Sequence, residues 1–150
     1  MKRFLTLAAF AALGVTTAAT PSHVEPSSKP VVTVYKDPNC GCCKNWIEHL
    51  IKHGYTVKVN DTRELKKVKQ SLGVPEKLEA CHTALVGAYL VEGHVPAADI
   101  DRLLKTNPKV AGIAVPGMPA GSPGMDMGAA QPYSVLSFDR TGKTSVFARH

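Results

Sequence analysis

The apolar positions between residues 31 and 59 change their spacing twice, and each change marks a new element. Residues 31–35 are β-branched and aromatic, which predicts a strand. The apolar side chains that follow recur at helical spacing and are Trp46, Ile47, Leu50 and Ile51. They predict a helix over 42–53 that ends at Gly54, and residues 55–59 predict a second strand. Such a βαβ unit joins parallel strands through a right-handed crossover.

The middle of the chain predicts a second helix, a hairpin and a third helix. Glu64 lies three residues after Asp61, which is the spacing of a capping box at a helix start. The predicted elements are a helix from this start to Gly73, a connector over 74–80, hairpin strands over 82–86 and 89–91, and a helix over 97–105. The order βαβ, helix, ββα is that of an α/β, thioredoxin-like fold.

The last forty residues predict an irregular loop followed by a hairpin. Residues 110–130 contain three prolines and five glycines, which disfavour both helix and strand, so we expect an irregular Met/Gly/Pro loop. Residues 133–138 and 144–147 mix serine and threonine with apolar residues and flank a turn over 139–142. They predict a C-terminal β-hairpin with no evident chemistry of its own.

The first thirty residues differ in composition from the rest of this 150-residue chain. Lys2 and Arg3 precede an apolar run of about a dozen residues and then small residues, which is typical of a secretory signal peptide and short for a membrane span. We therefore expect an exported, periplasmic protein without stable membrane insertion. The predicted divisions are a signal peptide (1–19), a flexible leader (20–30), a thioredoxin-like domain (31–128) and a hairpin extension (129–150).

The net charge of +6 does not indicate a nucleic-acid-binding protein. Much of the positive charge lies between Lys58 and Lys77, including Arg63, Lys66, Lys67 and Lys69, and no aromatic residue is interleaved for base stacking. An exported protein also rarely meets nucleic acid. We interpret this run as a solvated helix face and expect no nucleic-acid partner.

Three of the four cysteines, Cys40, Cys42 and Cys43, lie at the predicted turn from strand to helix. The positive end of a helix dipole stabilises a thiolate, which is both a nucleophile and a metal ligand. Cys40 and Cys43 have the Cys-x-x-Cys spacing of a redox pair. Disulfide exchange needs only two thiols, whereas three converging thiolates suit Cu(I) or Zn(II). We expect Cys43, on the apolar helix face, to be the most buried thiol.

Two further groups of soft or borderline ligands occur later in the chain. In a thioredoxin-like fold the loop entering the third strand crosses the Cys-x-x-Cys turn, and here that loop carries Cys81 and His82 in place of a proline. The three methionines after the predicted signal peptide all lie in the irregular loop and are Met118, Met125 and Met127. Thioethers are soft ligands for Cu(I), so this loop can cap the site or pass copper to it.

The remaining histidines give weaker indications. His49 and His53 have i, i+4 spacing, but His49 lies about 9 Å along the helix from Cys43, too far to share a metal with the cysteines. We interpret this pair as incidental and His23, in the leader, as solvated. For His94 the sequence leaves open whether the side chain faces the site.

Four separated motifs, within residues 36–43, 80–84, 92–96 and 115–119, resemble the CopG-type copper-resistance family. The resemblance covers residues 31–128 and does not extend past Ala129. It implies a small exported protein with a thioredoxin-like domain and a Cys-x-Cys-Cys metal site. The implied setting is copper resistance or homeostasis in the periplasm, alongside other periplasmic copper-handling proteins.

Three functions follow from these residues. The leading hypothesis is Cu(I) binding, of one or more ions, by Cys40, Cys42, Cys43, Cys81, His82 and the loop methionines, coupled to thiol redox chemistry. Whether such coupling makes the protein a copper/thiol oxidoreductase stays open. One alternative is a thiol-disulfide oxidoreductase in which Cys40 attacks and Cys43 resolves. The other is a structural zinc site formed by Cys40, Cys43, Cys81 and His82.

Overall fold

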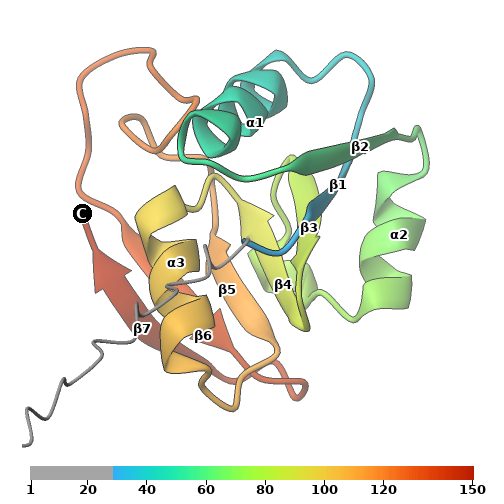
Figure 1. Cartoon of the computed structure of the whole chain (residues 1–150), viewed down its shortest axis with the longest axis vertical. Coiled ribbons are helices and arrows are strands. Elements are labelled where there is room, and N and C mark those ends of the chain that lie inside the picture. Colours follow the sequence, from blue (N-terminus) through green and yellow to red (C-terminus); the bar gives the residue numbers. More distant parts are fainter. Residues whose placement is uncertain (1–28) are drawn as a thin grey trace, which may run out of the picture.

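The computed structural model describes residues 29–150. The predicted signal peptide, His23 and all but the last two residues of the predicted leader lie outside this range. The strands are β1 (Val32–Lys36), β2 (Val57–Asp61), β3 (His82–Val86), β4 (Tyr89–Gly93), β5 (Gly112–Val115), β6 (Ser134–Phe138) and β7 (Thr144–Arg149). The helices are α1 (Gly41–Lys52), α2 (Leu65–Leu72), the 3₁₀ turn η1 (Glu76–Leu78) and α3 (Ala97–Thr106). Figure 1 shows their arrangement.

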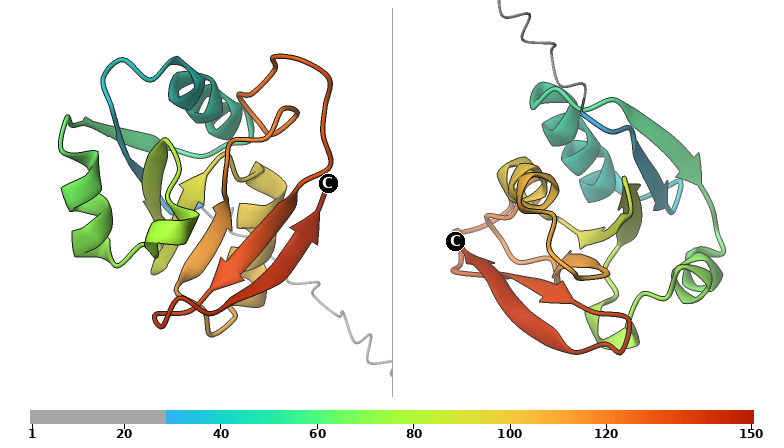
Figure 2. Two further views of the ribbon diagram at one scale, coloured as in Figure 1. Left: turned by 180° about the vertical axis from the view of Figure 1, so that it is seen from behind. Right: turned by 60° about the horizontal axis from the view of Figure 1, so that its bottom comes forward.

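The strands form one seven-stranded sheet in the order β2-β1-β3-β4-β5-β6-β7. β1 pairs with β2 in parallel, as the βαβ pattern predicts, and β3 and β4 form the predicted antiparallel hairpin. Helices α1 and α3 lie on one face of the sheet and α2 lies on the other (Figure 2). The α/β, thioredoxin-like fold expected from the sequence is therefore confirmed.

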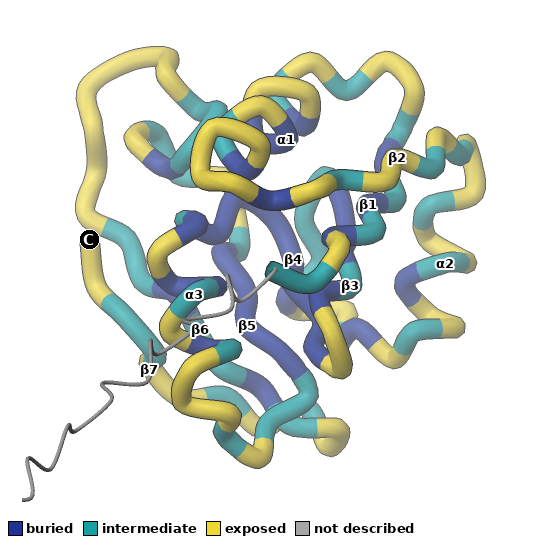
Figure 3. Tube along the Cα trace, viewed as in Figure 1, coloured by how far each residue is buried: buried dark blue, intermediate teal, exposed yellow. Residues whose placement is uncertain are grey.

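The core is divided by the sheet into two apolar clusters. The larger cluster includes Trp46 and Leu50 of α1 and Ile100 of α3, and the smaller one includes Leu78 and Phe138. Burial is concentrated in the central strands and the inner helix faces, whereas the turns and the outer helix faces are exposed (Figure 3). No helix within residues 29–150 has both the length and the apolarity needed to cross a membrane.

Helix α1 buries a stripe at helical spacing, namely Cys43, Trp46, Ile47 and Leu50. Ile51, which the periodicity also includes, is 55% exposed and lies outside this stripe. The stripe places Cys43 against the core at the first turn of the helix. The cysteine cluster is therefore anchored by the packing of the whole helix.

Strand β5 contradicts the prediction that residues 110–130 are entirely irregular. It pairs in parallel with β4 and antiparallel with β6, so the predicted C-terminal hairpin, which is confirmed, continues the main sheet. Gly112 is required at its start because a Cβ atom there would lie 2.2 Å from the carbonyl oxygen of Leu90. All four residues of β5 are buried.

Two predictions about the charged residues around α2 were also wrong. The capping box is absent, because Asp61 ends β2 and pairs with Lys36, with Nζ and Oδ1 2.8 Å apart, and α2 begins at Leu65. Lys66 and Lys67 are exposed as predicted, but Lys69 is only 3% exposed and forms an ion pair with buried Glu92. A helix that packs on a sheet can bury a lysine only if its charge is paired.

Candidate metal centre

The Cys-x-Cys-Cys turn lies where β1 leads into α1. Cys40 is the N-cap residue and is half-buried, and its side chain is joined to Cys43 by a disulfide with a Cα–Cα distance of 5.4 Å. Cys43 is fully buried, which confirms that it is the most buried cysteine. The structure therefore shows the site in a form in which two of its four cysteines are oxidised.

Cys81 meets this turn from the loop that leads into β3, the strand that pairs with β1. Its Sγ lies 3.9 Å from Sγ of Cys42, which in turn lies 3.6 Å from Sγ of Cys40. Sγ of Cys43 is 3.6 Å from the carbonyl oxygen of Cys81. The four sulfur atoms lie within 4.8 Å of one another, although Cys81 is 39 positions after Cys42. The fold thus gathers every cysteine of the chain into one cluster.

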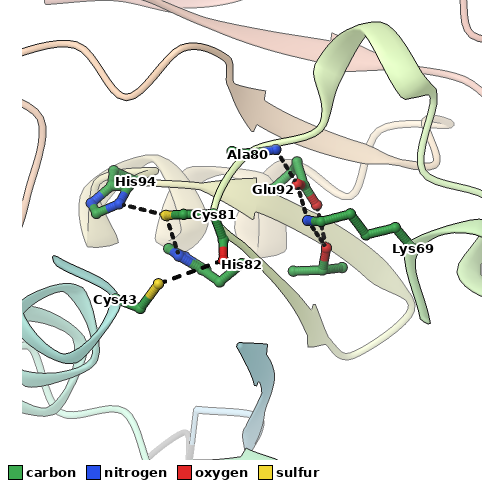
Figure 4. A network of polar contacts seen from close by, with 8 residues as sticks. Cys43, Lys69, Ala80, Cys81, His82, Glu92 and His94 are labelled. Atoms are coloured by element: carbon green, nitrogen blue, oxygen red, sulfur yellow. Dashed lines mark hydrogen bonds and ion pairs between the residues drawn. The ribbon is translucent and has the colours of Figure 1, made fainter. Parts of the chain in front are cut away.

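Two imidazoles contact the Cys81 thiol. Nε2 of His94 lies 3.0 Å from Sγ of Cys81, and Nδ1 of His82 lies 3.3 Å from it (Figure 4). Nδ1 of His94 donates a hydrogen bond to the carbonyl oxygen of Pro123 at 2.7 Å, so the lone pair of the neutral ring is on Nε2 and faces Cys81. His94, whose orientation the sequence left open, therefore faces the site.

His82 is fully buried and packs against Trp46, with ring centroids 4.2 Å apart. Among residues 29–150 its Nε2 atom has no hydrogen-bond partner. Leaving a buried polar atom unpaired costs about 1–3 kcal/mol. Such a cost is typical of sites where function, and not stability, determines the residue.

Burial determines the protonation states of the Cys81, His82 and His94 side chains. It raises the pKa of Cys81 to about 12, and the neighbouring Cys42 contributes to this rise. Burial also lowers the pKa of His82 well below its usual value, and it lowers the pKa of His94. At neutral pH the site thus holds a protonated Cys81 thiol between two neutral imidazoles. The imidazoles are ready to bind a metal, whereas Cys81 must first release its proton.

The three methionines border the cluster on its open side. Met118, Met125 and Met127 line a pocket of about 300 Å³ together with Cys42. Met127 is 82% exposed and Met118 is 37% exposed, so two solvent-exposed methionines share this pocket with Cys42. The loop that carries the methionines packs closely against α1 at Gly124, because a Cβ atom there would lie 2.8 Å from the backbone nitrogen of Trp46.

The other histidine pair is separate from this cluster. The rings of His49 and His53 lie 4.3 Å apart, but Nε2 of His49 accepts a hydrogen bond from the amide of Ala97 at 3.0 Å. Nδ1 of His53 lies 2.8 Å from the carbonyl oxygen of His49. The bond from Ala97 to His49 ties the end of α1 to the start of α3, and the contacts of His53 lie at the end of α1, so both histidines have structural contacts there.

The donor set of the cluster is soft to borderline: cysteine thiols, imidazoles and nearby thioethers. Carboxylates, which hard cations prefer, are absent from the two groups of candidate ligands found within residues 29–150. The arrangement suits Cu(I) or Zn(II). No local pattern in the sequence indicates the part played by the Pro123 carbonyl, because that contact is set by tertiary structure.

Comparison with known proteins gives two solved structures of high similarity. Both are of a protein named copper resistance protein CopG, in Form 1 and Form 2, and they are 45% and 44% identical to this chain. Their TM-scores are 0.76 and 0.77, and each match covers 81% of this chain and 98% of the other. A family model described as a protein of unknown function, DUF411, matches residues 78–125. None of the curated proteins matches the chain.

Proposed function

This chain belongs to the CopG copper-resistance family, and on that premise we propose that it is an exported protein of copper resistance and homeostasis that binds Cu(I). The observation that supports the proposal most directly is the convergence of four cysteine sulfurs within 4.8 Å. Thiolates favour soft and borderline ions such as Cu(I), the nearby thioethers favour Cu(I) further, and a sulfur that bridges two ions allows more than one to be held.

The proposed ligands combine the cysteine cluster with its neighbours. Cys40, Cys42, Cys43 and Cys81 supply the thiolates, His82 and His94 supply imidazoles, and Met118, Met125 and Met127 supply thioethers at the solvent side. The methionines receive copper and pass it to Cys42. Export to the periplasm, proposed from residues 1–19, would place the protein among other copper-handling proteins that donate or accept the ion.

We further propose that copper binding is coupled to the redox state of Cys40 and Cys43. Oxidation of this dithiol to the disulfide releases two protons to solvent and two electrons, and the two electrons suffice to reduce two Cu(II) ions to Cu(I). The disulfide also removes two of the four thiolate ligands. A protein that repeated this cycle with an external reductant would act as a copper/thiol oxidoreductase.

The deciding experiment is an anaerobic Cu(I) titration of the fully reduced mature protein, with bound metal counted by elemental analysis. Cys42→Ser is the test variant, because Cys42 lies between the disulfide pair and Cys81. We expect tight binding by the wild type and a lower copper content in the variant. Weak binding that Cys42→Ser leaves unchanged would contradict the proposal.

A thiol-disulfide oxidoreductase is the second candidate, and the disulfide between half-buried Cys40 and buried Cys43 favours it. This function predicts disulfide reductase activity that survives both Cys42→Ser and complete removal of metal. Loss of activity under either condition would exclude it. The zinc alternative would leave Cys42 unused, although its sulfur lies 3.9 Å from that of Cys81.

A further inference from the structure

A buried ion pair lies beside the loop that carries Cys81. Lys69 of α2 and Glu92 of β4 form a salt bridge, and their side chains are 4% and 0% exposed. Thr83 of β3, which lies opposite Glu92 in the sheet, accepts a hydrogen bond from Nζ of Lys69 at 2.6 Å and donates one to Oε2 of Glu92. Copper binding as proposed above uses none of these three side chains directly.

The carboxylate of Glu92 connects this pair to the metal site. Its Oε1 accepts a hydrogen bond at 2.6 Å from the backbone amide of Ala80, the residue before Cys81. Two residues after Glu92, the same chain segment presents His94, whose Nε2 lies 3.0 Å from Sγ of Cys81. One side chain thus links the two segments that supply Cys81 and His94 (Figure 4).

The two chain segments that Glu92 joins are packed closely against each other at Gly93 and Ala80. Gly93 has φ +71°, and a Cβ atom there would lie 2.8 Å from Cβ of Ala80. The loop before Cys81 therefore lies directly on the strand end that leads to His94. The amide hydrogen bond of Ala80 fixes how the two segments are oriented at this close approach.

Stability alone does not account for a buried ion pair at this position. Replacing both members of such a pair with apolar residues of similar volume is often neutral or stabilising. An apolar replacement cannot, however, accept the hydrogen bond of the Ala80 amide. A polar residue is therefore needed at this position to hold the loop that carries Cys81 in place.

We propose that Glu92 is a positioning residue for the metal site, and that it holds Cys81 against His94 through the amide of Ala80. The inference rests on the copper-binding function proposed above. Lys69 compensates the charge of the buried Glu92 carboxylate, and Thr83 holds this carboxylate in the orientation that reaches Ala80 by donating a hydrogen bond to Oε2. Loss of a group that orients a ligand in this way typically lowers metal affinity about 10- to 100-fold.

Two matched double variants test the proposal. K69M/E92Q and K69M/E92M both remove the charges and nearly preserve side-chain length, but only glutamine keeps an oxygen that accepts from the Ala80 amide. Cu(I) affinity is measured on the reduced full chain by competition with a chromophoric chelator. We expect K69M/E92M to bind about 10- to 100-fold more weakly than the wild type and K69M/E92Q to stay within a few-fold of it. Hydrogen exchange at the Ala80 amide should accelerate only in K69M/E92M.

The same pair in a Cys81→Ser background completes a mutant cycle. If the double substitutions act through Cys81, the difference between the two variants disappears in that background. The inference would be overturned if K69M/E92Q and K69M/E92M had equal Cu(I) affinities when Cys81 is present. It would also be overturned if their affinities still differed in the Cys81→Ser background. If urea denaturation shows that K69M/E92M is not folded, Thr83→Val replaces it. An unchanged Cu(I) affinity in Thr83→Val would also overturn the inference.

This design separates the inference from the function on which it rests. If Cys81→Ser alone leaves Cu(I) binding unchanged, Cys81 is not a ligand and the proposed site is wrong. If Cys81→Ser weakens binding but the two double variants bind equally, the site stands and the positioning role fails.

Discussion

Replacing Gly124 with alanine should separate the methionine loop from helix α1 and weaken Cu(I) binding. A Cβ atom at this position would lie 2.8 Å from the backbone nitrogen of Trp46 and 2.9 Å from the carbonyl oxygen of Cys42. Both neighbours are backbone atoms within α1 and cannot rotate away. The loop must therefore move, and with it the adjacent Pro123 carbonyl that fixes His94 and the adjacent Met125.

The cost has two parts that a control variant separates. Gly124 has φ +85°, where a non-glycine residue costs about 1–2 kcal/mol. Crowding against α1 adds about 1–3 kcal/mol, the usual range for overpacking. Gly128 has φ +88°, but a Cβ atom added there would have no neighbour within 4 Å, so Gly128→Ala carries the first cost alone. The two variants differ only in the contact with α1.

Urea unfolding and anaerobic Cu(I) competition on the two variants measure both effects. We expect Gly124→Ala to lose about 1–3 kcal/mol more unfolding free energy than Gly128→Ala. Its Cu(I) affinity should fall about 10-fold or more, because the hydrogen bond that orients His94 is disturbed. Equal stability and equal affinity in the two variants would refute the reasoning that the loop is seated through Gly124.

Two further predictions concern the ligands themselves. Replacing Met118, Met125 and Met127 together with leucine should weaken Cu(I) binding and leave the urea midpoint nearly unchanged, because two of the three are exposed; unchanged affinity would remove the thioethers from the site. Because burial raises the pKa of Cys81 to about 12, copper binding at neutral pH must displace a proton from this thiol. The apparent Cu(I) affinity should therefore rise with pH up to that pKa, by about tenfold per unit for each proton released. Cys81→Ser should reduce this slope when the titration is repeated at several pH values.

The central fold could be predicted because its signals are local. The β-branched run before Cys40 and the helical spacing of Trp46, Ile47 and Leu50 each lie within one element. Strand β5 was missed because it is short, begins at Gly112 and lies between prolines and glycines that favour a loop. Its identity as a strand depends on pairing with β4 and β6, which no local pattern reveals.

The site was predictable where fold topology alone brings residues together. The loop before β3 crosses the Cys-x-x-Cys turn in this fold, and Cys81 lies there as expected. The orientation of His94 depends on the Pro123 carbonyl, 29 positions later, and the burial of Lys69 depends on Glu92, 23 positions later. A charged residue in a basic run indicates a solvated face until its partner is known, so this error follows from the absence of tertiary information.

At this site the residues that undergo redox chemistry differ from the residues that hold the other side chains in place. Cys40 and Cys43 change their number of free thiols when the disulfide forms. The groups that contact the segments carrying the other proposed ligands are a carboxylate, a backbone carbonyl and a glycine, at Glu92, Pro123 and Gly124. None of these groups is oxidised by copper or by a disulfide. Formation of the disulfide therefore removes two thiolates together, and in this form Cys42 and His94 both remain within contact distance of Cys81.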